Sequence, residues 1–202
     1  MSLDTYEGLI AEVALLLNKT NLNAQIPSFI RLFEAQANRA IKHYKMQDRC
    51  TFDVEGDVAS LPCGFLGVST FKIDQHKVTY VTPDEMDDPR DAGGPWNGPP
   101  LYYSIVGDNL ILSSGVMTGK AVLRYFKRIP PLSETERCNW LLRDHPDVYL
   151  YGAALQAAPF LRDDERIGVW NSFVQSAYEG INTESIESQM GAHAEVQIRS
   201  IA

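Results

Sequence analysis

Acidic and histidine side chains gather in two short stretches of this 202-residue sequence. The first stretch contains Asp144, His145 and Asp147, and the second contains Asp163, Asp164 and Glu165. A histidine beside carboxylates can take a proton from water, and two carboxylates can divide the roles of general acid and general base. The chemistry that these residues could perform is therefore that of a small hydrolase.

The rules for helix ends explain the same residues without catalysis. Pro146 suits the first position of a helix, where its missing N–H costs nothing, so His145 is the expected N-cap and Asp147 a favourable anion in the first turn. The acidic run 163–165 stands where a second helix would begin, facing the positive end of the helix dipole. We favour this structural role over catalysis for both stretches.

The helices that would position these residues have strong apolar patterns. After Pro146, small residues such as Gly152 and Ala153 leave almost no polar face, which predicts a buried helix that Pro159 stops or kinks. The following helix carries a packing seam with a spacing of three and four residues: Ile167, Trp170, Val174, Ala177 and Ile181. Near the N-terminus, a capping box at Asp4 and Glu7 begins one amphipathic helix, and a second begins near Pro27.

Between these helical parts the sequence pattern is typical of β-strands and turns. Short β-branched and aromatic runs predict strands at 51–54, 67–74, 77–81, 101–106, 110–114 and 120–129. Gly107-Asp108-Asn109 predicts a hairpin turn, and residues 82–100 form a long polar loop rich in proline and glycine. Such a loop is a candidate ligand site for a small binding module.

The expected fold is α+β: a four-helix-type bundle, made of an N-terminal helical hairpin and two C-terminal helices, with an inserted small antiparallel β subdomain and an extended C-terminal tail. The expected boundaries are 1–49 for the hairpin, 50–130 for the β subdomain, 131–190 for the C-terminal helices and 191–202 for the tail. In the tail, Gly191 is a helix breaker, and Ala194, Val196 and Ile198 alternate with polar residues as in a strand. Such a tail is either a frayed terminus or a strand that is added to a sheet or groove of another protein.

Other kinds of site are not indicated. The histidines His43, His76, His145 and His193 lack metal-ligand spacing, and Gly115 to Lys120 matches a phosphate-binding loop only in part. Three scattered cysteines suggest reduced thiols, no apolar run is long enough to span a membrane, and we expect no cofactor. The formal charge of −8 argues against a protein that grips DNA phosphates.

Several segments together resemble the head-to-tail adaptor (connector) proteins of tailed bacteriophages. The helical hairpin is represented by 17–22 (LNKTNL), 26–30 and 34–39, the β region by 61–66 (LPCGFL) and 100–107, and the C-terminal part by 131–133, 139–142, 145–152 (HPDVYLYG), 158–161 (APFL) and 163–166. The segment LPCGFL departs from the family's LPxDFL turn at Cys63 and Gly64. The order and spacing of these segments cover nearly the whole chain.

The resemblance implies a virion structural protein that is not an enzyme. Members of this kind form a ring, usually a dodecamer, that docks beneath the portal protein, presents a platform to the tail or nozzle and lets genome DNA pass through its lumen. It also implies assembly in the host bacterial cytoplasm and a C-terminal extension that reaches the portal, for which Ala194, Val196, Ile198 and Ile201 are the candidate contacts. The hydrolase using the two acidic stretches remains the alternative.

Overall fold

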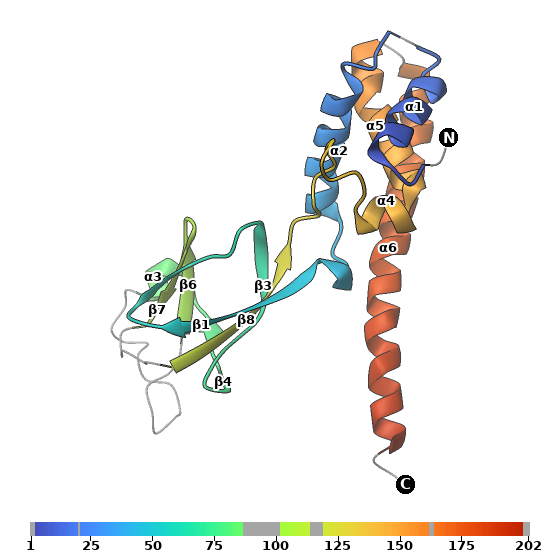
Figure 1. The fold of residues 1–202 in the computed structure, drawn as a ribbon. Coiled ribbons are helices and arrows are strands. Elements are labelled where there is room, and N and C mark those ends of the chain that lie inside the picture. The colour runs from blue at the N-terminus through green and yellow to red at the C-terminus, as the bar shows by residue number, and fades with distance from the viewer. Residues whose placement is uncertain (1–2, 20, 87–101, 114–118, 162–163, 200–202) are drawn as a thin grey trace. The chain divides into compact units, whose positions relative to one another are not determined.

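The chain folds into two compact units in the computed structural model (Figure 1). The structure describes residues 3–19, 21–86, 102–113, 119–161 and 164–199. A helical unit comprises Met1–Met46 and Ile129–Ala202, and a β unit comprises Gln47–Arg128. The chain therefore leaves the helical unit once, builds the β unit and returns.

The N-terminal part of the helical unit is a pair of helices followed by a short 3-10 turn. These are α1 (Tyr6–Leu16), α2 (Ile26–Ala40) and η1 (Tyr44–Met46). The hydroxyl of Thr5 caps α1 by accepting a hydrogen bond from the Gly8 N–H at 3.2 Å, so the capping box predicted at Asp4 is wrong. Pro27 lies in the first turn of α2, as predicted.

The C-terminal part of the helical unit contains α4 (Trp140–Asp144), α5 (Pro146–Leu161) and α6 (Asp164–Arg199). Pro146 is the first residue of α5, which confirms the predicted helix start. Pro159 lies inside α5 and does not end it, because only the last turn follows and a single backbone hydrogen bond is lost. The 36-residue α6 extends well past the other helices of this unit (Figure 1).

A close contact between α2 and α5 lies in the core of the helical unit. Gly152 of α5 faces the ring of Phe33 of α2, and a Cβ atom added at Gly152 would lie 2.1 Å from the Phe33 Cδ2 atom. Phe33 is fully buried and packs edge-on against Tyr149, with 5.0 Å between the ring centroids. The glycine thus permits the two helices to approach each other.

In its described residues, the β unit is built from short strands and one short helix. They are β1 (Gln47–Val54), β2 (Val58–Ser60), β3 (Phe65–Ile73), β4 (His76–Lys77), β5 (Thr79–Tyr80), α3 (Pro83–Met86), β6 (Tyr102–Val106), β7 (Asn109–Leu112) and β8 (Gly119–Lys127). Strands β6 and β7 form a hairpin in which Val106 pairs with Asn109, so the turn is Gly107-Asp108. Gly107 has a φ of +59°, which suits this tight turn.

Within the described residues, the strands form two four-stranded sheets. One sheet has the order β1-β8-β3-β4 and the other β2-β7-β6-β5. Gly56, at φ +101°, lies where the chain passes from β1 in the first sheet to β2 in the second. Side chains of both sheets share one core that includes Phe71, Leu123, Tyr103 and Leu110.

The predicted architecture is wrong, although the chain is α+β. The β part is two sheets rather than one small antiparallel subdomain, and it includes a parallel pair, β5 with β6. The helical part has the additional helix α4 between the hairpin and the two long helices. The predicted extended tail is helical through Arg199, since Ala, Glu, Gln and Arg favour helix and α6 is already nucleated when it reaches Gly191.

Candidate functional site

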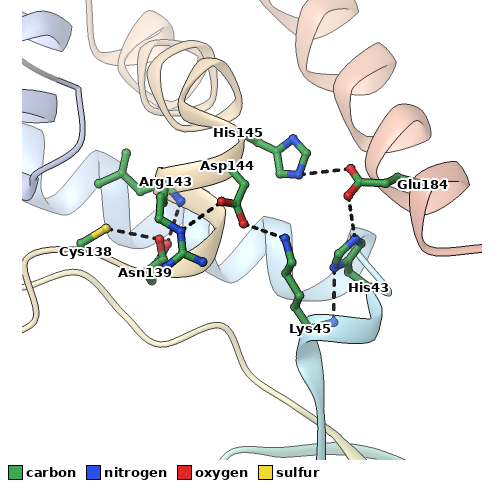
Figure 2. Close-up of polar contacts among 9 residues, drawn as sticks. His43, Lys45, Cys138, Asn139, Arg143, Asp144, His145 and Glu184 are labelled. Carbon is green, nitrogen blue, oxygen red and sulfur yellow. Dashed lines mark hydrogen bonds and ion pairs between the residues drawn. The ribbon is translucent and has the colours of Figure 1, made fainter. Parts of the chain in front are cut away.

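The first acidic stretch lies at the corner between α4 and α5. Asp144 ends α4 and His145 joins the two helices (Figure 2). Asp147 lies in the first turn of α5. One oxygen of Asp144 is 2.7 Å from the Lys45 Nζ atom, and the other accepts a hydrogen bond from the Arg143 Nε at 3.1 Å. These two cationic donors lower the pKa of Asp144 to about 2.

The contacts of Asp144 with Lys45 and Arg143 indicate a structural role for this carboxylate. A carboxylate with a pKa of about 2 stays ionised at neutral pH and is a poor proton acceptor, whereas a general base works best with a pKa near the working pH. The imidazole of His145 points toward Glu184 of α6 and away from Asp144 (Figure 2). Asp144 and His145 are therefore neighbours in the sequence, but in the structure their side chains contact different partners.

A cluster of two imidazoles and one carboxylate lies beside this corner. The His43 Nε2 is 3.7 Å from one oxygen of Glu184, and the His145 Nε2 is 3.6 Å from the other (Figure 2). The indole of Trp140 stacks on the His43 ring, with 5.0 Å between centroids and an angle of 15°. Sequence reasoning missed this cluster because its residues lie in distant parts of the chain, and no local spacing pattern signals it.

Hydrogen bonds tie α6 to the segment between α2 and η1. The Lys42 N–H donates to the Asn182 Oδ1 at 2.8 Å, and the Tyr44 N–H donates to the Ser185 Oγ at 3.0 Å. The Asn182 Nδ2 donates in turn to the Ala40 carbonyl at 3.2 Å. The last bond satisfies a carbonyl that the end of α2 leaves open, and the first two satisfy N–H groups of the chain that follows α2. Together they fix the turn of α6 that carries Glu184.

A second polar network is buried between α2, α5 and the segment that precedes α4. The Glu34 Oε1 accepts hydrogen bonds from the Leu132 N–H at 2.8 Å and from the Tyr149 hydroxyl at 3.1 Å. The Asn139 Nδ2 donates to the Tyr149 hydroxyl at 2.6 Å and to the Pro130 carbonyl at 2.7 Å. Burial raises the pKa of Glu34, and it also raises the pKa of Tyr149. Because its members bond to one another, this network holds the core together and does not face solvent.

The other candidate residues lie in α6 or outside the described residues. Asp164 and Glu165 lie in the first turn of α6, as expected for an acidic helix start, and Asp163 lies outside the described residues. Ala194, Val196 and Ile198 lie in the helical backbone of α6, and Ile201 lies outside the described residues. The long loop from 87 onward and residues 114–118, with most of the partial phosphate-loop match, also lie outside them.

The described part of the chain provides neither a metal-binding group nor a membrane-spanning helix. No group of three or more His, Cys, Asp or Glu side chains there has an arrangement that could hold a metal ion, although His43 and His145 share Glu184. Among the same residues, no helix combines the length and the apolar character needed to cross a membrane.

A protein-family model matches nearly the whole chain. The family model described as "SU10 adaptor protein" matches residues 4–196, which include both units, and no curated protein matches the chain. The match covers all the segments in which the sequence resembles head-to-tail adaptors. The chain therefore belongs to the SU10 adaptor protein family, a family of phage head-to-tail adaptors.

Proposed function

We propose that this adaptor acts as a structural subunit of a closed ring that joins the portal to the tail or nozzle of the virion. The proposal rests on the outer face of α6, by which we mean the solvent-exposed side of the helix. Apolar side chains are exposed there, with Val169 at 53% and Phe173 at 48% of full exposure. An exposed apolar helix face of this kind suits side-by-side packing of identical subunits in a cyclic assembly.

Small residues on α6 support the same assembly. Gly168, Ser172, Ser176 and Gly180 recur every four residues, all are exposed, and at 3.6 residues per turn they lie opposite the buried side of α6. Nothing lies within 4 Å of a Cβ atom added at Gly168 or Gly180. Glycine inside an exposed helix costs about 1 kcal/mol relative to alanine. In the described part of the single chain these glycines have no structural role. In a ring they would allow the helix of a neighbouring subunit to approach α6 closely.

The charge of the protein supports a lumen through which DNA passes without adhering. The formal net charge is −8, and tight binding to DNA phosphates depends on clustered lysine and arginine. We infer a dodecamer as the ring because a dodecamer is what the sequence resemblance implies. Assembly would take place in the host cytoplasm before the virion is complete.

We further propose that the C-terminal end of α6 contacts the portal through Ala194, Val196, Ile198 and Ile201. The helical backbone changes how such a contact would form. A helix places positions 194 and 198 one turn apart on a single face, so the contact would be a helix in a groove rather than an added strand.

The acidic corner supports a structural role and not a hydrolytic one. The carboxylate of Asp144 is held by Lys45 and Arg143, and Asp147 is an exposed first-turn anion at the start of α5. We therefore propose that the protein is not an enzyme and needs no cofactor. Its work would consist of contacts with itself, the portal and the tail.

The direct test is electron microscopy of the purified protein mixed with its portal. We expect rings seated on the portal, with a particle mass many times that of the monomer. A chain that ends at Met190 is the matched variant, and we expect it to keep its melting temperature while docking on the portal more weakly. A protein that stays monomeric beside the portal would overturn the proposed function, and full docking by the truncated chain would overturn the proposed contact.

Gly180→Ala tests the outer face of α6. In the isolated chain, the substitution is expected to raise the free energy of unfolding by roughly 0.5–1 kcal/mol, since no atom opposes the added methyl group. In the ring, the same methyl group is expected to reduce the yield of assembled particles. Asn171→Ala, an exposed position on another side of α6, is the control that should assemble normally. A normal ring yield for Gly180→Ala would show that this face stays open in the particle.

A further inference from the structure

Two histidines of the helical unit approach the two oxygens of one carboxylate. His43 follows α2, His145 joins α4 to α5, and Glu184 lies in the middle of α6 (Figure 2). The side chain of His43 is completely buried and that of His145 is 20% exposed, whereas Glu184 is 44% exposed. The carboxylate thus lies between two largely buried imidazoles and the solvent-exposed side of α6.

The hydrogen bond at the other ring nitrogen fixes the proton of His43. The His43 Nδ1 accepts a hydrogen bond from the Lys45 N–H at 3.3 Å, so a neutral ring carries its proton on Nε2. This Nε2 is buried and has no hydrogen-bond partner among the described residues, and the carboxylate of Glu184 faces it at 3.7 Å. In the same described part of the chain, the buried His145 Nε2 also lacks a hydrogen-bond partner and lies 3.6 Å from the same carboxylate. The Nε2–H of His43 is thus within a small movement of an N–H···O bond to Glu184.

The surroundings of His43 disfavour its charged form. Burial is the main cause of a lowered pKa, while Glu184 acts in the opposite direction. Of the other charged groups that face the ring, Lys45 and His145 lower the pKa further and Asp144 raises it. The indole of Trp140 covers one face of the imidazole and helps to keep water away.

The cluster lies at one of the places where α6 is attached to the rest of the helical unit. Asn182 and Ser185, on either side of Glu184, accept the hydrogen bonds from the Lys42 and Tyr44 N–H groups. Exposure of His43 to water requires this turn of α6 to separate from the segment after α2. Protonation of His43 and attachment of α6 are therefore coupled through the same few residues.

We propose that His43, His145 and Glu184 form a proton-sensitive latch, with His43 as the sensing group, which holds the middle of α6 in place at neutral pH and releases it as the pH falls. In the released state His43 is in water and regains its ordinary pKa of about 6.5, above its pKa in the closed state. The closed state is then fully favoured above about pH 6.5 and loses stability as the pH falls toward the lowered pKa. This proposal concerns the single chain and does not depend on ring assembly.

Hydrogen exchange of the Lys42 and Tyr44 amides measures the release directly, because both amides donate to α6. We expect their exchange, corrected for the intrinsic rate at each pH, to accelerate by up to about tenfold for each pH unit below about 6.5. His43→Phe keeps an aromatic ring against Trp140 but cannot titrate, and its corrected exchange is expected to be independent of pH in this range. His76→Phe, an exposed position on β4, is the control that should behave like the unaltered chain.

A second readout uses the charge on Glu184. Because this carboxylate favours the protonated form of His43, Glu184→Gln is expected to move the NMR titration of the His43 ring to lower pH. A purely structural role for Glu184 would leave that titration unchanged. The proposal is overturned if Glu184→Gln has no effect on the titration, or if His43→Phe keeps the pH dependence of the Lys42 and Tyr44 amides.

Discussion

Gly152→Leu is expected to lower the free energy of unfolding by about 3 kcal/mol or more, at the upper end of the range for overpacked cores. A Cβ atom at this position would lie 2.1 Å from the Phe33 Cδ2 and 2.2 Å from its Cε2. The Phe33 ring cannot move aside easily, because it is fully buried and lies against Tyr149. The two helices would have to separate to accommodate even the first carbon of the new side chain.

Urea denaturation of the isolated chain measures this effect as a lower midpoint with an unchanged slope. Gly152→Ala is the graded variant, and it should also destabilise the fold because its single methyl group already meets the ring. Gly168→Ala is the matched control in open space, where stability is expected to rise slightly. An unchanged midpoint for Gly152→Leu would contradict the close contact between α2 and α5.

Glu34→Ala is expected to lower the free energy of unfolding by about 3 kcal/mol. The substitution removes the acceptor of two buried hydrogen bonds, those from the Leu132 N–H and the Tyr149 hydroxyl. The Leu132 N–H would lose the acceptor that Glu34 provides, and a cavity would remain between α2 and α5. A buried donor without an acceptor costs more than the net value of the bond itself. A loss below about 1 kcal/mol would show that water replaces the carboxylate.

The pH dependence of Glu34→Gln isolates the charge of this carboxylate. Burial raises the pKa of Glu34 above its ordinary 4.5, so the folded protein holds this proton more readily than the unfolded chain does. Its stabilising contribution is complete below about pH 4.5 and is lost as the pH rises through the raised pKa. Glutamine cannot titrate. The stability of the unaltered chain relative to Glu34→Gln is therefore expected to decrease as the pH rises from about 4.5 toward neutral. Urea titrations of both proteins across this range provide the comparison, and a constant difference would contradict the prediction.

Local rules predicted the beginnings of several elements correctly. Pro146 starts α5 because a proline at the first helical position loses no hydrogen bond, and Pro27 lies in the first turn of α2 for the same reason. Gly107 supplies the positive φ of the hairpin turn between β6 and β7. These features depend on one or two neighbouring residues, so the sequence alone determined them. The order of such segments along the chain also carried the resemblance to the adaptor family.

The same rules failed where two local options have similar energies. Ala194, Val196 and Ile198 alternate like a strand, yet their segment continues α6, since adding residues to an existing helix costs far less than starting a new element. Thr5, and not Asp4, caps α1. Either residue suits an N-cap, and the packing of α1 decides which of the two takes that position.

The tertiary structure alone decided which buried polar groups meet. Tyr149 reaches Glu34 across 115 positions of sequence, and the Ser185 hydroxyl accepts from the Tyr44 N–H across 141. No periodicity signals such pairs, because helix and strand patterns reflect neighbours within a few residues. Burial of apolar faces contributes most of the free energy that brings the helices together. Each buried polar group must then form a hydrogen bond with a partner that this packing places within reach. For this reason the helix starts could be predicted from the sequence, whereas the latch at Glu184 and the network at Glu34 became visible only in the folded chain.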